Sequence, residues 1–481
     1  MGEPNQPQID HQRDELDSAI VEVAPEPSRG GLSLEGMHGS VAVPHHQAGF
    51  WLQWRAFVGP AILVSVGYMD PGNWGTDLAA GAQFKYGLLW VVGLASLMAI
   101  FMQVIAARLG VVTGKDLAQC CRDWYPSWTR QPNWLFCELA IGACDLAEVL
   151  GSAVALNLLF GIPLLWAVII TGLDVLLLLA LQRFGVRTIE AVVLLLVATI
   201  GVCYFIEIFV LPQTRPSFVE MSAALVRPGF AESGMMVLAI GIIGATVMPH
   251  NLYLHSALVQ SRVMQKDEPS LRSGILFNTI DATAALTIAF FVNAAILVLA
   301  ALVFYGKLSV LVPGGQVVTF SPASDWIRVA YLTLAPLLGT SLAGTLFAIA
   351  LLASGQSSTI TGTLAGQVVM EGFMHWRIKP WLRRLITRTL AIVPAVVIIG
   401  IRGNSSVTDL LVLSQVVLAL QLPFAMFPLL QFTSSRRRMG KWRNGWLLSI
   451  AGWGSALLIT AMDVYSLPDA LKQAWTVVVG H

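Results

Sequence analysis

Long apolar runs, separated by short polar connections, fill most of this chain. Eleven such segments fall roughly at 52–84, 87–111, 133–160, 162–182, 188–211, 234–262, 273–304, 325–356, 386–401, 407–432 and 444–464. Because about 20 consecutive apolar residues cross the hydrocarbon core of a bilayer, each run is long enough, or nearly so, to span a membrane. The pattern therefore predicts an all-α membrane protein with eleven transmembrane helices.

The regions on either side of these segments have a different composition. Residues 1–48 are polar and rich in Pro, Gly, Glu and Gln, and they lack the apolar core of a signal peptide. We therefore expect a disordered tail at 1–48, a transmembrane domain at 49–465 and a short tail at 466–481.

Two of the apolar segments contain a helix breaker near mid-membrane depth. The first carries Asp70-Pro71-Gly72-Asn73 and the sixth carries Met248-Pro249-His250-Asn251. A proline removes a backbone donor and clashes with the preceding turn, so each helix should unwind at its proline and free backbone carbonyl groups there. Inside a membrane such groups must be satisfied by other protein groups or must line a wet cavity.

The two broken segments also indicate an internal repeat. Segments one to five and six to ten each begin with a broken helix, and five is an odd number, so the second copy enters the membrane from the opposite side. The chain is therefore predicted to contain a 5+5 inverted repeat, with segment eleven outside it. Paired broken helices of this kind are the best sequence pointer to a transporter binding site.

Basic residues set the expected orientation. With the N-terminus in the cytoplasm, the inside loops hold most of the Lys and Arg residues, such as Arg122 and the run Arg436-Arg437-Arg438. The outside loops hold few, among them Lys85 and Lys307. This arrangement satisfies the positive-inside rule and predicts a multi-pass protein of the cell (inner) membrane, with the C-terminus outside.

The amino-acid composition supports the assignment to a membrane protein and argues against several other classes of protein. The chain is 56% hydrophobic and 12% charged, against about 25% charged in a typical soluble domain. The net charge of +1 gives no support for a nucleic-acid partner. The five cysteines form no CxxC pair and mostly lie in or beside apolar runs, so we expect small buried side chains, without a disulfide framework or zinc site.

The groups at the two breaks form a candidate metal site. Asp70 is a carboxylate inside an apolar span, where a charge costs about 2.5–3.5 kcal/mol and is poorly tolerated without a role. Asn73 offers an amide oxygen, Met248 offers a thioether sulfur, and Pro249 leaves the Ala245 carbonyl without its amide partner. Oxygen ligands with one soft sulfur favour a transition metal over Mg²⁺ or Ca²⁺.

A second group of ionisable residues suggests a proton route. Glu138, Asp145 and Glu148 follow each other at spacings of seven and three, so they share one face of the third helix. They either relay protons or pair with a buried basic residue such as Arg388, and the two roles are compatible.

Two histidines follow the second break. His250 either carries a proton or holds the helix geometry, and a pKa near 6.5 for an unperturbed histidine suits the first role. His255 is expected to be a gating or structural residue.

The motifs at both breaks resemble the signature pair of the natural resistance-associated macrophage protein (Nramp) family. The stretch from Gly355 to Gln367 is similar to that family's transport motif, which we expect after the eighth span, and the resemblance covers about residues 50–465. It implies a LeuT-type fold and a proton-coupled importer of Mn²⁺ or Fe²⁺, like the bacterial manganese members, with Cd²⁺ as a further substrate.

The resemblance also implies roles for individual residues. Asp70, Asn73, Met248 and the Ala245 carbonyl would bind the metal, and Gln415 in the tenth span would join them in one conformational state. Asp70 would be the first proton acceptor. Pro71, Gly72 and Pro249 would have gating or structural roles.

Three rival functions remain at this point. Another carrier of the same architecture, for amino acids or polyamines, would have no need of an Asp–Asn–Met set. A receptor with this bundle would carry a large cytosolic output domain, which we do not expect here. An intramembrane metalloenzyme would need three strong ligands, and HExxH is absent. We therefore expect no enzyme activity, no cofactor and no obligate protein partner, with metal ions, protons and membrane lipid as the partners.

Overall fold

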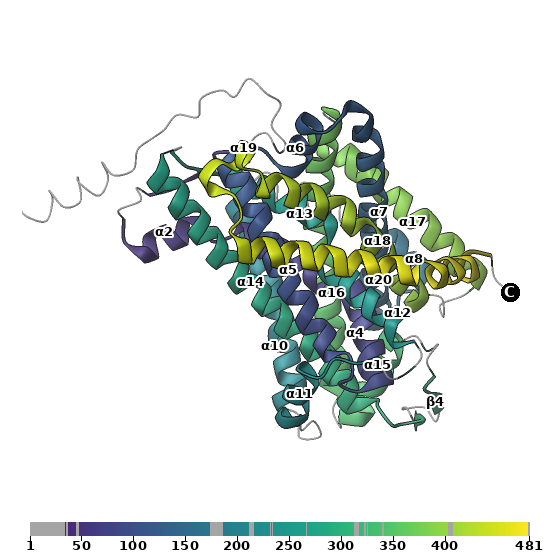
Figure 1. Ribbon diagram of the computed structural model, residues 1–481. Coiled ribbons are helices and arrows are strands. Elements are labelled where there is room, and N and C mark those ends of the chain that lie inside the picture. The colour runs from purple at the N-terminus through teal and green to yellow at the C-terminus, as the bar shows by residue number, and fades with distance from the viewer. Residues whose placement is uncertain are drawn as a thin grey trace, which may run out of the picture.

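The protein is a nearly all-helical bundle, seen here in a computed structural model (Figure 1). The structure describes residues 34, 37–44, 48–173, 186–210, 216–230, 232, 234–265, 267–311, 317–321, 324, 326–338, 341–376, 378–402 and 407–479. Its helical elements are α2 (Phe50–Phe57), α3 (Pro60–Ser65), η1 (Val66–Met69), α4 (Pro71–Phe84), α5 (Leu89–Thr113), α6 (Leu117–Trp124), η2 (Ser127–Thr129), α7 (Arg130–Phe160), α8 (Leu164–Thr171), α10 (Val186–Phe205), η3 (Ile206–Val210), α11 (Phe218–Leu225), α12 (Met235–Thr246), α13 (Pro249–Leu258), η4 (Val259–Ser261), α14 (Glu268–Val303), α15 (Trp326–Leu338), α16 (Ser341–Met374), α17 (Pro380–Arg402), α18 (Val407–Ser434), α19 (Arg436–Met439), η6 (Gly440–Trp442) and α20 (Trp446–Val479).

Two pairs of short strands lie outside the bundle. β1 (Val41–Ala42) pairs in parallel with β2 (Arg262–Val263), and β3 (Ser309–Leu311) pairs antiparallel with β4 (Val317–Thr319). Most of the predicted tail at 1–48, including 1–33, is outside the described residues. Its described end is attached to the bundle through β1.

Apolar helices long enough to cross a membrane dominate the fold, as predicted. Eight helices in the described part of the chain meet this criterion, and the shorter apolar helices Pro60–Met69 and Leu385–Ile401 add to them. The predicted fourth segment, 162–182, is described only as far as residue 173, where α8 covers its first part.

Both predicted breaks are present. The first segment divides into α3, η1 and α4, and the sixth divides into α12 and α13. Each second half begins at the proline that the sequence analysis identified, Pro71 in α4 and Pro249 in α13. Proline suits a first helical position because the amide that it lacks would have had no partner in the helix.

The prediction of a single eighth helix at 325–356 is wrong. Two helices share this stretch, because α15 ends at Leu338 and the long helix α16 runs from Ser341 to Met374. The Gly355–Gln367 motif therefore lies inside the long helix and does not follow a span. In addition, α20 continues to Val479, well past the predicted end of the eleventh segment at 464.

Packing places the two breaks in the middle of the molecule. α16 packs on α7, α14 packs on α4 and α5, and α18 contacts α7, α12 and α20. Asp70 and Met248 are both fully buried. All five cysteines are free and buried, as predicted.

The two ends of the bundle differ in charge. α6 and α19 lie at one end, whereas α11 and β4 lie at the other (Figure 1). We call the first the basic end, because it carries Arg122 and the run Arg436-Arg437-Arg438.

Candidate metal site between two broken helices

Both breaks are built in the same way. Asp70 and Met248 each occupy the extended position just before a helix, and a proline follows each of them directly. The Asp70 side chain caps its helix by accepting a hydrogen bond from the Asn73 backbone amide at 2.9 Å. A carboxylate at this position is favoured because it satisfies an unpaired amide group and faces the positive end of the helix dipole.

A hydrogen bond joins the two breaks. The Asn73 side-chain amide donates to Asp70 Oδ1 at 2.7 Å and to the Ala245 carbonyl oxygen at 3.2 Å. The amide nitrogen therefore lies between two oxygens that both belong to the predicted metal site. A cation with the same two neighbours would replace this donor.

The Met248 sulfur also faces the first broken helix. A Cβ atom added to Gly67 in η1 would lie 3.3 Å from Met248 Sδ. The Asn251 side-chain amide donates to the same sulfur at 3.6 Å, and Met248 packs with Ala140, Cys144 and Leu418. The sulfur is thus inside the protein and close to the break that carries Asp70.

The buried oxygens without a hydrogen-bond partner within the described part of the chain include Asp70 Oδ2 and Gln415 Oε1 at this point. Gln415 faces the first break, because a Cβ atom added to Gly72 would collide with its side-chain amide. Buried oxygens without a partner are costly. A cation bound here would satisfy both of them.

The donor set is mixed rather than a cluster of strong ligands. Among the described residues, no group of three or more His, Cys, Asp or Glu side chains could hold a metal ion. The candidate site instead has one carboxylate, two side-chain amides, a backbone carbonyl and a thioether, from Asp70, Asn73, Gln415, Ala245 and Met248. It lacks the three strong ligands of a catalytic zinc centre.

Asn293 of α14 supports the site, and the sequence analysis did not assign it. Its side-chain amide donates to the Tyr68 carbonyl at 2.7 Å and to Asn73 Oδ1 at 3.3 Å. Asn73 is therefore oriented from both sides. An asparagine in an apolar span was the available signal, but spacing alone does not distinguish a pathway residue from one that joins two helices.

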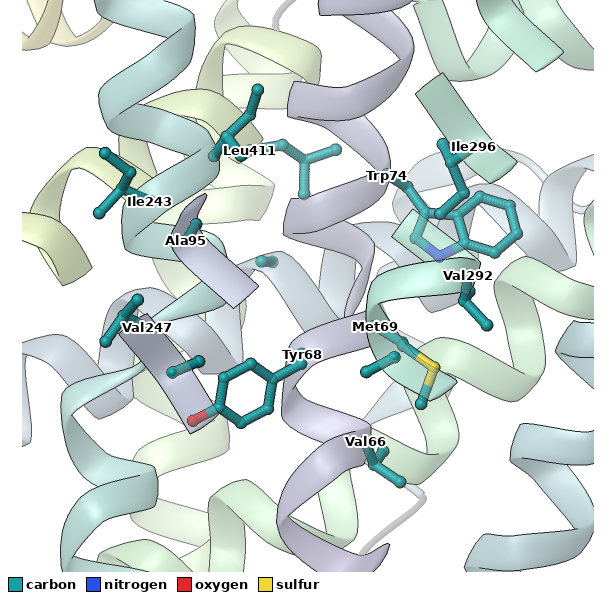
Figure 2. Close-up of a cluster of buried hydrophobic side chains, with 14 of the residues drawn as sticks. Val66, Tyr68, Met69, Trp74, Ala95, Ile243, Val247, Val292, Ile296 and Leu411 are labelled. Carbon is teal, nitrogen blue, oxygen red and sulfur yellow. The ribbon is translucent and has the colours of Figure 1, made fainter. Parts of the chain in front are cut away.

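A second row of hydrogen-bonded polar side chains lies beside the first break. Tyr68 Oη accepts from the Gln103 side chain at 2.6 Å, and Gln103 Oε1 lies 3.0 Å from His255 Nδ1. Figure 2 shows Tyr68 directed toward the side that carries Ile243 and Val247, with Met69 and Trp74 on the opposite side. This row of side chains links η1, α5 and α13. The arrangement suits the gating or structural role predicted for His255.

His250 is buried next to the second break. Its Nδ1 atom has no hydrogen-bond partner among the described residues, and the side chain is 1% exposed. His255, in contrast, is held by its contact with Gln103. Both of the roles considered for His250 therefore stay open.

The three carboxylates of α7 divide into two groups. Glu138 pairs with Arg383 at 2.7 Å, close to the basic end. The sequence analysis named only Arg388 as a partner and missed Arg383, because the contact depends on how α17 packs against α7.

Asp145 and Glu148 share the predicted partner Arg388. The guanidinium group lies 3.9 Å from Asp145 Oδ1 and 3.6 Å from Glu148 Oε2. Thr359 of α16 donates to Glu148 Oε2 at 3.0 Å and accepts from Arg388 at 3.1 Å. These ionisable groups form a continuous buried row between α7, α16 and α17.

At the basic end, charged groups hold the start of the first broken helix. Arg262 pairs with Glu190 at 2.9 Å and donates to the Val58 carbonyl at 2.8 Å. Asp281 accepts from the amides of Gly59 and Ala61 at 3.2 and 3.0 Å. In this structure the basic end of the first segment is therefore tied to α10, β2 and α14.

Asp77 is a buried carboxylate near the first break that the sequence analysis did not single out. Asp77 lies seven residues after Asp70 on α4, is 1% exposed, and has no hydrogen-bond partner for either oxygen within the described ranges. Its spacing from Asp70 was a signal in the sequence, because residues seven apart share a helix face.

Comparisons with known proteins agree on one family. The model of the family described as natural resistance-associated macrophage protein-like matches residues 61–469. A divalent metal cation transporter MntH from Nostoc sp. is 50% identical over 451 residues, which cover 92% of this chain and 98% of the relative. The MntH of Xanthomonas campestris is 48% identical over 474 residues, covering 97% and 100%.

Solved structures give the same result. A crystal structure of the Eremococcus coleocola manganese transporter, in complex with an aromatic bis-isothiourea substituted compound, matches with a TM-score of 0.81 at 38% identity, covering 91% of each chain. MHP1, a nucleobase-cation-symport-1 family transporter, matches with a TM-score of 0.56 at 14% identity, covering 91% of this chain and 95% of MHP1. The second likeness shows the fold alone.

Proposed function

Because this chain belongs to the natural resistance-associated macrophage protein (Nramp) family, we propose that it imports divalent transition metal ions, with Mn²⁺ as the main substrate, by proton-coupled alternating access. Fe²⁺ and Cd²⁺ are further proposed substrates. The relatives' names, divalent metal cation transporter and manganese transporter, support the substrate class.

One observation carries the proposal. The buried oxygens Asp70 Oδ2 and Gln415 Oε1 have no partner among the described residues, and they lie at the break that faces the Ala245 carbonyl and the Met248 sulfur. A dication that accepts both oxygen and sulfur ligands would satisfy these four groups together. An amino acid would bring a carboxylate toward Asp70, and the two like charges would repel each other.

Binding requires Asn73 to change partners. Its amide nitrogen now lies between Asp70 Oδ1 and the Ala245 carbonyl, so a metal ion that enters must displace it. A rotation of the amide would then present its oxygen to the ion. The ion exchanges part of its water shell for these ligands, and Asn293 and Gln415 complete the environment.

The proton is proposed to leave along α7. The arriving dication disfavours a proton on Asp70. The row formed by Asp145, Glu148 and Arg388 offers the next ionisable groups, and the Glu138–Arg383 pair lies beyond it toward the basic end. An inward-negative membrane potential favours each entering charge by about 2.3 kcal/mol per 100 mV.

Alternating access is proposed to use the two broken helices. The eleven-span count, the 5+5 inverted repeat and the placement of the basic end in the cytoplasm belong to this proposal. The positive-inside rule supports the orientation. The contacts of Arg262 and Asp281 with residues 58–61 would have to break for the site to open toward the basic end.

Uptake into proteoliposomes tests the proposal. With Mn²⁺ outside and an inward-negative potential, we expect Mn²⁺ entry together with acidification of the interior, each followed by its own dye. Asp70→Ala should abolish both signals because it removes the charged ligand. Glu220→Gln, at an exposed ion pair with Lys85, is the matched control and should transport normally.

The outcomes separate the parts of the proposal. Mn²⁺ uptake by Asp70→Ala at the wild-type rate would exclude the site. Uptake by the wild-type protein without acidification would remove proton coupling and leave metal import standing.

A further inference from the structure

Two adjoining cavities lie at the basic end, away from the candidate metal site. The first, of about 610 Å³, is lined by Asp123, Trp124, Gln431, Ser435, Arg437 and Arg438. The second, of about 740 Å³, is almost entirely apolar and lies between α7, α18 and α20. We call them the head cavity and the tail groove.

The two cavities meet at one hydrogen bond. Tyr125 borders the tail groove and donates through its hydroxyl group to Gln431 Oε1 of the head cavity at 2.6 Å. Trp124, the residue before Tyr125, lines the head cavity. A molecule with a polar and an apolar part would therefore occupy both sides of this contact.

The head cavity presents two guanidinium groups without a counter-charge. Arg438 stacks over the rings of Trp124 and Phe432, with distances of 4.7 and 4.5 Å to the ring centroids. Neither Arg437 nor Arg438 makes a side-chain hydrogen bond or ion pair with any residue that the structure describes. Stacked arginines with free donors are well suited to bind phosphate groups.

The acidic residue of the head cavity is already compensated. Asp123 pairs with Lys115 at 2.8 Å and with Arg122 at 3.1 Å. The head cavity therefore keeps an excess of positive charge from Arg437 and Arg438.

The tail groove has the shape and chemistry of an acyl-chain site. Its walls include Phe136 of α7, Phe424 and Phe427 of α18, and Leu467 of α20. α18 ends at Ser434, so its groove residues, Leu420 to Pro428, lie about two to four turns before that end. The groove thus runs from the basic end into the membrane.

The positions of the charged groups set the direction of the occupant. The Asp463 carboxylate of α20 lines the tail groove, is 4% exposed, and has no hydrogen-bond partner among the described residues for either oxygen. An anionic group is attracted to Arg437 and Arg438, whereas no basic side chain is among the residues that line the tail groove. A negatively charged amphiphile can therefore enter in one orientation only.

We propose that the head cavity and the tail groove together bind an anionic phospholipid from the adjacent leaflet. Its phosphate contacts Arg437 and Arg438, and one acyl chain lies between α7, α18 and α20. Basic pockets between membrane helices bind such head groups. The site is independent of the proposed transport function.

Lipid titration of the purified full-length protein tests this site. The protein is stripped of lipid in detergent, and phosphatidylglycerol is compared with phosphatidylcholine of the same acyl chains by native mass spectrometry. We expect phosphatidylglycerol to bind at least about tenfold more tightly. The double variant Arg437→Gln, Arg438→Gln should bind it about thirtyfold more weakly, which corresponds to about 1 kcal/mol for each basic residue.

Two further variants separate the head from the tail. Arg443→Gln changes an exposed arginine that does not line either cavity, and it should bind lipid normally. Thr460→Trp fills the tail groove and should weaken phosphatidylglycerol without weakening glycerol phosphate, which has no acyl chain. Thr460 bonds only to the carbonyl of its own helix, so this change breaks no hydrogen bond between helices.

The proposal has clear contrary outcomes. Equal affinity for the two lipids, or normal phosphatidylglycerol binding by the double arginine variant, would overturn it. If Thr460→Trp binds phosphatidylglycerol normally, and glycerol phosphate competes as strongly as the whole lipid does, the site binds a free phosphate group only. Mn²⁺ binding and the melting temperature of each variant show whether it is folded.

Discussion

Single atoms decide what the candidate metal site can select. In the proposed site, Asp70, Asn73, Gln415 and Ala245 would supply oxygens, which any divalent cation accepts, and Met248 would supply the sulfur. A soft thioether favours transition metals and Cd²⁺ over Mg²⁺ and Ca²⁺. We therefore expect discrimination against the abundant hard cations to depend on this one side chain.

Replacing Met248 tests this selectivity. Met248→Leu keeps the side-chain volume and removes the sulfur, whereas Met248→Ala removes both. We expect both variants to keep Mn²⁺ uptake better than Cd²⁺ uptake and to admit Ca²⁺ or Mg²⁺ as competitors. Competition assays in proteoliposomes measure this, and unchanged selectivity in Met248→Leu would remove sulfur from the mechanism.

The sequence alone was sufficient to identify the residues at the two breaks. It was not sufficient to identify the residues from other helices that contact them. A proline next to a carboxylate in an apolar run is visible without coordinates, so Asp70 and Met248 could be found. The Arg383–Glu138 pair joins residues 245 positions apart, and it depends on which face of α17 turns toward α7. Hydrophobic periodicity shows which face of a helix is buried, but it does not show which other helix packs against that face.

Helix boundaries show a similar limit at the element scale. α16 has a mean hydropathy of 1.2, the lowest of the eight candidate spans in the described part of the chain, because Ser and Thr residues interrupt its apolar pattern. Ser357, Ser358 and Thr363 bond to carbonyls of their own helix, so their hydroxyl groups need no water. An apolar pattern alone therefore placed the eighth segment too early.

Close packing of α7 on the first break allows a matched pair of variants. A Cβ atom added to Gly151 would collide with Pro71, whereas one added to Gly142, on the same helix, would meet nothing within 4 Å. Gly151→Ala should displace Pro71 and Asp70, lower the stability by about 1–3 kcal/mol and raise the KM for Mn²⁺. Gly142→Ala should behave like the wild type.

Melting curves and initial uptake rates measure the two effects. Because both changes add one methyl group to α7, a shared effect on helix propensity cancels between them. Equal KM values in the two variants would show that Pro71 does not position Asp70.

At the scale of the whole molecule, the charge distribution is the basis of the proposed orientation in the membrane. The five cysteines are buried, so a membrane-impermeant maleimide should leave the wild-type protein unlabelled. Leu308 beside β3 is 85% exposed, and Lys441 lies in η6 at the basic end. Cysteines at these two positions therefore report the two sides of the membrane.

We expect Leu308→Cys to be labelled in intact cells and Lys441→Cys only after the membrane is permeabilised. Gel-shift assays on both variants measure this. The reverse pattern would invert the proposed orientation, and with it the direction of transport.

The pairing of β1 with β2 has a mechanical consequence. The Leu34 amide bonds to Glu371 at 2.9 Å near the end of α16, while Val41 and Ala42 are bound to the strand that follows α13. The first described residues thus form a strap between α13, which follows the second break, and α16, which carries Thr359 of the buried row. When the end of α13 moves relative to α16, this strap must either slacken or detach, so a fusion partner placed within it would alter the range of that motion.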